Sequence, residues 1–352
     1  MLLSRATSRI VLALAIAFAP TSFAACGGSH LLSSDDAIDA GSRDASASDA
    51  GFEDAAFTWR EVSPCPLPRF EAMGTFVGDR LLVMGGFTSG KLDKTLLVHA
   101  YDPIHDTWET RTELPVSPEH SGLAVQGRIV YLAGGLDPIN NFVWAYDVER
   151  DTYAEMPAMQ TFRAAMALVI YDGTLHAITG LASDGQSDLD VHQTLALDAG
   201  LGTPWTTLPE HVPNPRNHLG GAAIGDRIFI VGGRHNWDEQ AGNQDTLSIF
   251  DPATSTWADG PPIPLARSEI NGSTFAMHDK LVVVGGAVNP AHPSAQVFVF
   301  DPRTNAWSQL PDLPGPRKGA VAAQWNDSII VSTGSPTGTD PDGTTWIGCC
   351  MN

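Results

Sequence analysis

One phrase recurs six times along this chain, with a period near 50 residues. Each copy is a short apolar run that ends in a glycine pair or in a single glycine, and after the first five copies an aromatic residue follows 18 to 25 positions later. The glycine positions are Gly85-Gly86, Gly134-Gly135, Thr179-Gly180, Gly232-Gly233, Gly285-Gly286 and Thr333-Gly334. The aromatic residues are Trp108, Tyr153, Trp205, Trp257 and Trp307, and Trp59 precedes the first glycine pair. A repeat of this length indicates one small structural unit that packs against its own copies.

Each repeat is predicted to form four short strands. In the first repeat these are residues 71–77, 80–84, 95–101 and 108–112. The second strand of each repeat is almost wholly apolar, which is typical of a strand buried on both faces. The chain has 34 Gly and 25 Pro but only 17% charged residues, which favours strands joined by turns over helices.

Between the third and fourth strands a second pattern appears. It reads Tyr101-Asp102-Pro103 with Trp108 seven residues after the tyrosine, and it returns at Phe250 and at Phe300. Together with the glycine pair, this string resembles the kelch motif, and the resemblance covers roughly residues 57–352. The resemblance implies blades of four antiparallel strands in a β-propeller. The second and third repeats depart from it, for example by Tyr153 in place of tryptophan.

The chain ends predict how the ring closes. Only 18 residues follow Gly334, and Trp346 lies where a third strand is expected, so the last repeat lacks its fourth strand. The segment around Trp59 resembles a fourth strand, but it precedes the first repeat and so has no first three strands before it. We therefore expect an all-β, six-bladed kelch-type β-propeller closed by the N-terminal strand, which leaves no exposed sheet edge.

The first 56 residues are expected to lie outside the propeller. Residues 1–26 read as a lipoprotein-type signal peptide, with Cys26 as the lipidated residue; ordinary cleavage after Ala24 or Ala25 is the alternative. Residues 27–56, rich in Asp, Ala and Ser, are predicted to be a disordered linker before the propeller of residues 57–352. The expected location is the cell envelope, as an outer-membrane lipoprotein held only by its lipid anchor, or the periplasm or exterior without lipidation.

The net charge of −20 argues against a nucleic-acid partner. No cofactor is expected, and no cysteine or histidine spacing predicts a metal site. Cys350 aligns with Phe300 of the previous repeat, which would place it too far from Cys65 for a disulfide. For Cys349 and Cys350, free thiols are favoured over a strained bridge between the two neighbours.

The candidate binding residues start from a repeated arginine. Five repeats have arginine where the first strand begins, and the alignment of the repeats places Glu119 at this position in the second repeat. These arginines are Arg69, Arg163, Arg216, Arg267 and Arg317. The resemblance implies that such arginines bind carboxylates in some relatives; the alternative is that they hold the blades together through loop acids or carbonyls. The fourth repeat adds His218, Arg234, His235 and Trp237, and the fifth adds Glu269.

Three functions fit these features. The favoured one is a binding module, expected to be monomeric, that captures an anionic peptide or glycan at an arginine-lined mouth. The alternative is a sugar mutarotase similar to bacterial N-acetylneuraminate epimerases. A copper radical oxidase fits less well, because the five tyrosines do not fall at the predicted mouth.

Overall fold

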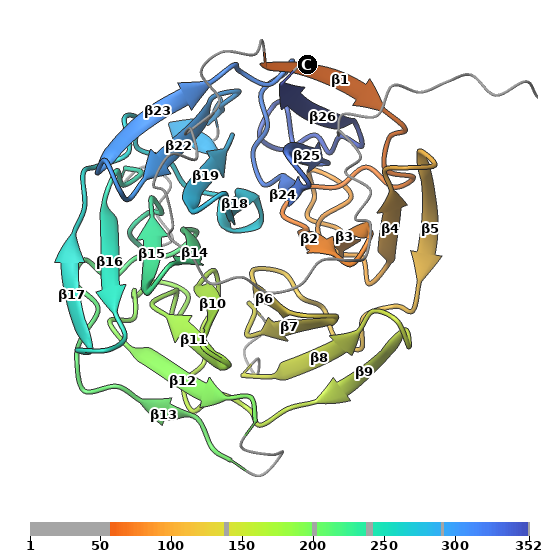
Figure 1. Cartoon of the computed structure of the whole chain (residues 1–352). Coiled ribbons are helices and arrows are strands. Elements are labelled where there is room, and N and C mark those ends of the chain that lie inside the picture. The colour runs from red at the N-terminus through yellow and green to blue at the C-terminus, as the bar shows by residue number, and fades with distance from the viewer. Residues whose placement is uncertain (1–56, 137–140, 199–202, 237–241, 290–291, 351–352) are drawn as a thin grey trace, which may run out of the picture.

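The computed structural model describes residues 57–136, 141–198, 203–236, 242–289 and 292–350. Within these residues the chain forms six four-stranded antiparallel sheets, arranged as blades around a central axis (Figure 1). A small hairpin, β20 (Ala287–Asn289) with β21 (His292–Pro293), extends the fifth repeat. The one helical element in this part of the chain is the 3-10 turn η1 (Asn271–Ser273). The predicted six-bladed all-β propeller is confirmed.

Each blade runs from an innermost strand near the axis to an outermost strand at the rim. Blades 1 to 3 consist of β2 (Met73–Val77), β3 (Arg80–Met84), β4 (Val98–Asp102), β5 (Thr107–Arg111); β6 (Gly122–Gln126), β7 (Ile129–Ala133), β8 (Val143–Asp147), β9 (Thr152–Glu155); and β10 (Ala167–Tyr171), β11 (Thr174–Ile178), β12 (His192–Ala196), β13 (Thr206–Thr207). Blades 4 to 6 consist of β14 (Gly220–Ile224), β15 (Arg227–Val231), β16 (Leu247–Asp251), β17 (Thr256–Asp259); β18 (Thr274–Met277), β19 (Lys280–Val284), β22 (Val297–Asp301), β23 (Ala306–Leu310); and β24 (Val321–Trp325), β25 (Ser328–Ser332), β26 (Thr345–Cys350), β1 (Phe57–Val62).

The N-terminal strand completes the sixth blade. β1 pairs antiparallel with β26, and Trp59 lies opposite Gly348. In blade 5 the equivalent pair is Phe300 with Trp307, so Gly348, not Cys350, occupies the position of Phe300. A Cβ on Gly348 would come within 2.6 Å of the rings of Phe57 and Trp59, so only glycine fits there. The predicted closure by the N-terminal strand is confirmed.

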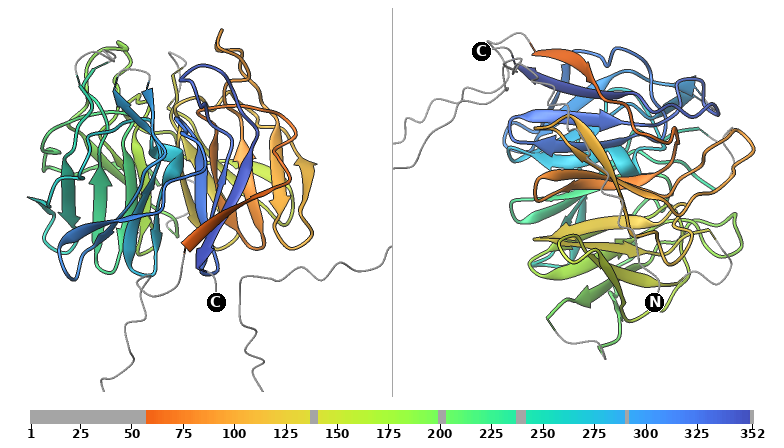
Figure 2. Two further views of the ribbon diagram at one scale, coloured as in Figure 1. Left: turned by 90° about the horizontal axis from the view of Figure 1, so that it is seen from above. Right: turned by 90° about the vertical axis from the view of Figure 1, so that its right-hand side faces the viewer.

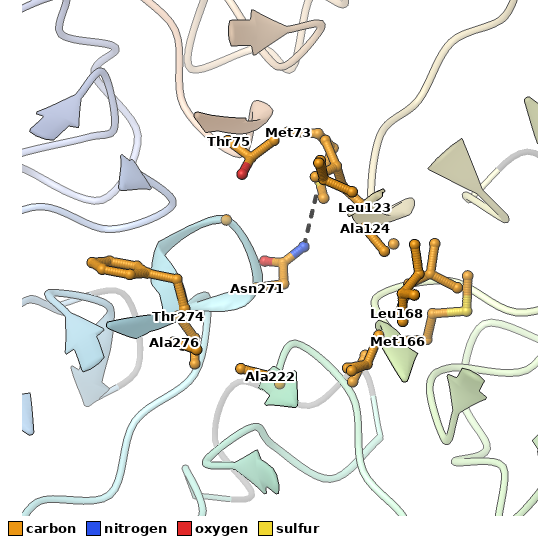
Figure 3. Close-up of a pocket in the computed structure, with 18 of the residues that line it drawn as sticks. Met73, Thr75, Leu123, Ala124, Met166, Leu168, Ala222, Asn271, Thr274 and Ala276 are labelled. Atoms are coloured by element: carbon orange, nitrogen blue, oxygen red, sulfur yellow. Dashed lines mark hydrogen bonds between the residues drawn. The ribbon is translucent and has the colours of Figure 1, made fainter. Parts of the chain in front are cut away.

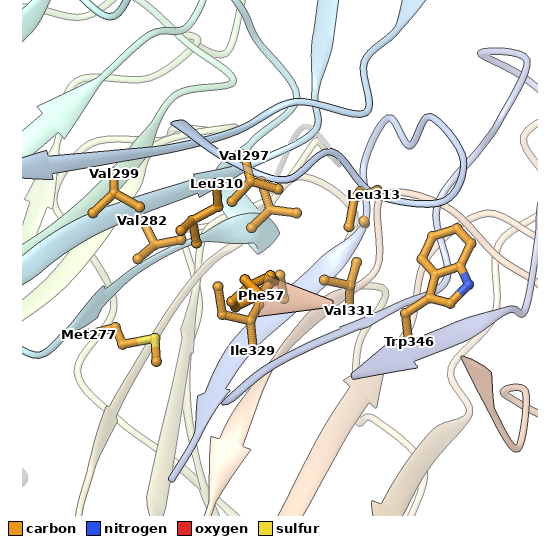
Figure 4. Packing of buried hydrophobic residues seen from close by; sticks show 13 residues of the cluster. Phe57, Met277, Val282, Val297, Val299, Leu310, Leu313, Ile329, Val331 and Trp346 are labelled. Carbon is orange, nitrogen blue, oxygen red and sulfur yellow. The ribbon is translucent and has the colours of Figure 1, made fainter. Parts of the chain in front are cut away.

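Hydrophobic side chains fill the seams between neighbouring blades. Between blades 5 and 6, Phe57 from β1 packs with Val297, Leu310 and Val331 (Figure 4). The second strand of each blade is the most deeply buried. In β3, for example, Leu81 through Met84 are fully buried, as their apolar sequence predicts.

Indole N–H groups join neighbouring blades at the rim. Trp307 Nε1 donates to the carbonyl of Pro261 in the preceding blade over 2.9 Å, and Trp108 Nε1 donates to Ser63 over 2.9 Å. Trp59 donates to Pro311 over 3.0 Å, which adds a link between blade 6 and blade 5. In these blades the repeated aromatic residue thus bonds to the preceding blade as well as filling the seam, whereas Trp257 Nε1 in blade 4 has no hydrogen-bond partner among the described residues.

The strand directions define two faces. The loop face carries the connections between the second and third strands of each blade and those between successive blades. The turn face carries the remaining, shorter turns. Figure 2 shows the longer loops gathered at one end of the ring.

The cysteines differ in state. Cys65 is buried and free. Cys349 is disulfide-bonded, and its partner lies outside the side chains that the structure describes. The expectation of a free thiol at Cys349 is therefore wrong; the strand-position argument had excluded only a bridge to Cys65.

Candidate functional site

The five repeated arginines lie inside the blades. None is more than 4% exposed, although each stands at the start of its repeat on the loop face. Arg216 shows the arrangement: its Nε donates to the carbonyl of Gly232 over 2.6 Å, and its terminal nitrogens donate to Asn214 and Ile230 over 2.9 and 3.1 Å. Burial lowers the pKa of Arg216 to about 10, so it stays charged at neutral pH.

The other arginines are held in related ways. Arg69 and Arg163 donate to carbonyls of their own blades. Arg267 donates to Gly285 and stacks 4.6 Å from the centre of the Phe298 ring. Arg317 lies 4.3 Å from the Trp346 ring centre and 3.1 Å from Asp342. The expected mouth of accessible guanidinium groups is not found, because backbone carbonyls and aromatic rings already occupy these groups.

The position assigned to Glu119 is corrected by one residue. In the other repeats the residue after the arginine pairs with the residue after the glycine pair, as Phe70 does with Phe87. Glu119 has this role in blade 2, because its carbonyl accepts from the amide of Leu136. The arginine position of the second repeat is therefore Pro118. Glu119 itself is buried, and its carboxylate lies 3.2 Å from Lys94 Nζ.

Six residues with positive φ form a ring around the axis on the loop face. Each comes just before the innermost strand of its blade, and five of the six are not glycine. They are Glu71, His120, Ala165, His218, Glu269 and Gly319, with φ between 50° and 61°. Backbone hydrogen bonds link several neighbours: Ala165 N donates to His120 O over 2.6 Å, and His218 N donates to Ala165 O over 2.8 Å.

Four of these six positions have titratable side chains, and these carboxylates meet imidazoles across blade boundaries. His120 Nε2 lies 3.1 Å from Glu71 Oε2, and His218 Nε2 lies 3.7 Å from Glu269 Oε1. The two imidazole rings also touch each other edge to face, with centroids 4.8 Å apart. Two carboxylate–histidine pairs therefore meet at the axis.

Two cations complete this group, which we call the axial cluster. Arg234 NH1 lies 2.9 Å from Glu269 Oε1, and Lys318 Nζ lies 4.0 Å from Glu71 Oε1. Apart from Glu71, which is 12% exposed in its side chain, the members are nearly buried. The axial cluster consists of Glu71, His120, His218, Arg234, Glu269 and Lys318.

The surroundings set the charge of the axial cluster. Burial raises the pKa of Glu269, but the charges of Arg234 and Lys318 outweigh burial, and its pKa lies below the ordinary value. Burial and the guanidinium of Arg234 hold the pKa of His218 well below its ordinary value. At neutral pH an ionised carboxylate therefore lies beside a neutral imidazole, an arrangement that can accept or relay a proton.

The positive φ values show that the backbone of this cluster is strained. A non-glycine residue in the left-handed region costs of order 1 kcal/mol or more, and such strain tends to gather at functional sites. Here glutamate and histidine occupy positions where glycine or asparagine would relieve the strain.

Several predicted site residues belong to this cluster. His218, Arg234 and Glu269 are brought together at the axis, whereas His235 lies aside: its Nδ1 is 3.0 Å from the carbonyl of Pro215. Trp237 lies outside the described residues. Sequence reasoning missed Glu71, His120 and Lys318. A signal existed for Glu71, since it stands two residues after an arginine, as His218 and Glu269 do.

The described residues contain no group of three His, Cys, Asp or Glu side chains arranged to hold a metal ion. They also contain no helix of the length and apolarity needed to cross a bilayer.

Comparison with known proteins agrees with the fold. Residues 215–264 and 271–314 match the Kelch motif. A Kelch-like protein of Aspergillus terreus is 28% identical over 76% of this chain and 61% of its own length. A kelch repeat-containing protein of Arabidopsis thaliana is 26% identical over 78% of this chain and 70% of its own length. Kelch-like protein 38 of Mus musculus is 24% identical over 58% of this chain, which spans 34% of that relative. The motif match, the six blades and these relatives together show that the chain is similar to kelch-repeat proteins.

Proposed function

We propose that this propeller is a protein-binding module and that a loop of blade 1 on the loop face makes the first contact. The observation that carries the proposal is Leu92, which is 52% exposed and has a φ of +62°. An exposed leucine gains no burial that would offset this strain, so the loop holds it outward at a cost in stability.

The loop around Leu92 is rigid, and it differs in charge from the chain as a whole. Backbone bonds join Thr88 to Asp93 and Leu92 to Ser89, and Ser89 Oγ donates to the Asp93 carboxylate over 2.7 Å. Lys91 precedes Leu92 and is exposed, although the chain carries a net charge of −20; Asp93 is bonded by Ser89, and Lys94 lies 3.2 Å from the Glu119 carboxylate. A rigid loop loses little entropy on binding. The partner that fits is a peptide segment with acidic and apolar side chains.

Peptide display against the full chain tests this proposal. Selected peptides should combine acidic with apolar residues, and Lys91→Glu and Leu92→Ser should each weaken their binding about tenfold in fluorescence anisotropy. Ile104→Ser is the matched control, because Ile104 is 69% exposed but lies in a turn on the opposite face. Equal binding by all three variants would contradict a site on this loop. Selection of neutral glycans on an array instead would contradict a peptide ligand.

The axial cluster favours a second candidate, a sugar mutarotase. Anomer exchange needs a base that takes the proton of the anomeric hydroxyl and an acid that protonates the ring oxygen. The neutral imidazole of His218 would act as the base, and the nearby His120 would return a proton. Lys318 and Arg234 would attract the carboxylate of an acidic sugar.

Exchange spectroscopy by NMR with free sialic acid tests the second candidate. The full chain should accelerate anomer exchange, and His218→Asn and Glu269→Gln should abolish the acceleration. His278→Asn, which changes an imidazole on the turn face, should leave it intact. An intact chain that gives only the uncatalysed exchange rate would rule the mutarotase out.

We also propose that the chain is exported and tethered to a membrane through lipid on Cys26. The support is the sequence before Cys26, which lies outside the described residues. Labelling with a radioactive fatty acid in a bacterial host should mark the chain but not the Cys26→Ala variant. Label in both variants would disprove this anchor.

A further inference from the structure

The six innermost strands enclose a cavity on the propeller axis. Its volume is about 250 Å³, and its walls come from β2, β6, β10, β14, β18 and β24 with the turn η1. Figure 3 shows Thr75, Ala124, Leu168, Ala222 and Ala276 around it. Five of these strands begin two residues after a residue of the positive-φ ring, and β18 begins five residues after Glu269, so that ring lies at one end of the cavity.

The lining excludes a charged ligand. Among the described residues that line the cavity there is no Asp, Glu, Lys, Arg or His. A charge taken out of water costs several kcal/mol or more unless an opposite charge or a set of hydrogen bonds compensates it. The occupant of this cavity is therefore uncharged.

The strand edges exclude a purely apolar ligand. Each innermost strand hydrogen-bonds to one neighbour within its sheet, as β2 does to β3 and β14 to β15. Because backbone groups alternate between the two edges of a strand, the other edge presents N–H and C=O groups to the axis. A hydrocarbon in the cavity would strip water from these groups and return no hydrogen bond.

One side chain adds a hydrogen-bonding group to the walls. Asn271, on η1, points into the cavity, where its Nδ2 lies 3.7 Å from the sulfur of Met73 (Figure 3). A thioether is a weak acceptor, so the amide is available to a better one. This amide suits a hydroxyl group, which donates and accepts.

We propose that the axial cavity binds an uncharged, hydroxyl-rich small molecule of the polyol or neutral monosaccharide class. The volume equals roughly eight water molecules, which limits the ligand to a small one. The hydroxyl groups replace water on the strand edges, and one of them accepts from the amide of Asn271. This site is separate from the loop of blade 1, and it requires no catalysis by the axial cluster.

Saturation-transfer NMR with the full chain tests the cavity directly. The probes are erythritol and D-glucose, with D-gluconate as the charged counterpart and 1-hexanol as the apolar one. Transfer is expected to erythritol or glucose, and weaker or no transfer to gluconate and hexanol. Transfer to neither hydroxyl-rich probe, or stronger transfer to gluconate or hexanol, would overturn the proposal.

Variants locate the binding. Ala276→Trp, at an exposed position in the lining, should block the cavity and lower the affinity at least tenfold. Ala258→Trp, on the exposed rim strand β17, is the matched control and should bind as the original chain does. Asn271→Leu keeps the size of the side chain and removes an amide whose partner is only the Met73 sulfur, so the melting temperature should hold while affinity falls about fivefold. Undiminished binding by both Ala276→Trp and Asn271→Leu would place the ligand elsewhere.

Discussion

At the scale of single residues, the repeated arginines show how a position can be predicted while its role is not. Their spacing identified five equivalent residues, and all five occupy equivalent positions in the structure. The sequence carries no information on whether such a side chain turns toward solvent or back into its own blade. For Arg69, Arg216 and Arg267 a carbonyl of the glycine pair accepts from the guanidinium group, which supplies several donors at once.

The first prediction concerns Arg216. Replacement by methionine keeps much of the apolar stem but leaves the carbonyls of Gly232, Asn214 and Ile230 without these donors. We expect a loss of about 3–5 kcal/mol in the free energy of unfolding, measured by urea denaturation. Arg227→Met is the control, since its partners are the carboxylates of Asp226 and Asp251 at the surface, and it should cost about 1 kcal/mol or less. An unchanged stability of Arg216→Met would show that these bonds contribute little.

The second prediction concerns buried histidines. Burial lowers the pKa of His99 and of His176 to about 4, and burial with the nearby His176 lowers that of His192 to about 2. In the unfolded chain these groups bind protons below about pH 6.5, whereas the folded protein does not bind them until far lower pH. Their contribution to stability is therefore complete above about pH 6.5 and is lost as the pH falls from there toward 4.

This loss can be measured as a slope. Each such histidine adds about 1.4 kcal/mol per pH unit to the decline of the unfolding free energy within that window. His192→Phe should reduce the slope by about one proton, since the ring packs against Phe250 and Trp257; it should also lower the stability at pH 7, because His192 Nε2 lies 2.9 Å from His176 Nδ1 and that hydrogen bond is lost. Urea titrations from pH 7 to 4.5 provide the comparison. The same slope in both proteins would mean that His192 is protonated in the fold.

At the scale of strands, the predictable part of the fold is the part that repeats. The apolar second strand was placed without error at residues 80–84, because burial on both faces leaves a continuous apolar run. The first strand was predicted from residue 71, yet β2 begins at Met73. Glu71 is in the left-handed region instead, and no local sequence rule predicts glutamate there.

The axial cluster escaped prediction for the same physical reason. Its members come from five different blades and meet only because the ring closes, so no spacing along the chain reveals their contacts. His120 in the second repeat was also missed. Pro118 replaces the repeated arginine there, so Glu119 was aligned with the arginines and the alignment of this repeat was wrong by one residue. Only His218, Arg234 and Glu269 were named in advance, from the polar character of their repeats.

The third prediction concerns the indole links between blades. Trp307→Phe keeps the aromatic packing against Phe300 but removes the N–H that bonds to Pro261. We expect a loss of about 1 kcal/mol in the free energy of unfolding. Trp144→Phe is a matched control, because Trp144 Nε1 has no hydrogen-bond partner among the described residues, and it should cost less. The reverse order of the two variants would argue that indole packing alone matters at the seams.

At the scale of the whole molecule, the first and last parts of the propeller depend on each other. β1 supplies the outer strand of blade 6, the ring of Phe57 between blades 5 and 6, and the indole bond from Trp59 to Pro311. Removal of residues 1–62 would expose the edge of β26 and open that seam to water. The remaining chain would still hold five complete blades, so secondary structure should persist at low temperature.

The fourth prediction follows from this closure. A chain that begins after Val62 should melt on the order of 10 °C below a chain that begins at Phe57, since a buried phenylalanine and a row of strand pairs are lost together. The second chain is the control, because it lacks the same N-terminal residues but keeps β1. The uncovered edge of β26 should also pair with other copies, which light scattering would detect as a rise in mass with concentration. Equal melting temperatures would mean that the other five seams alone hold the ring closed and that β1 adds no stability to blade 6.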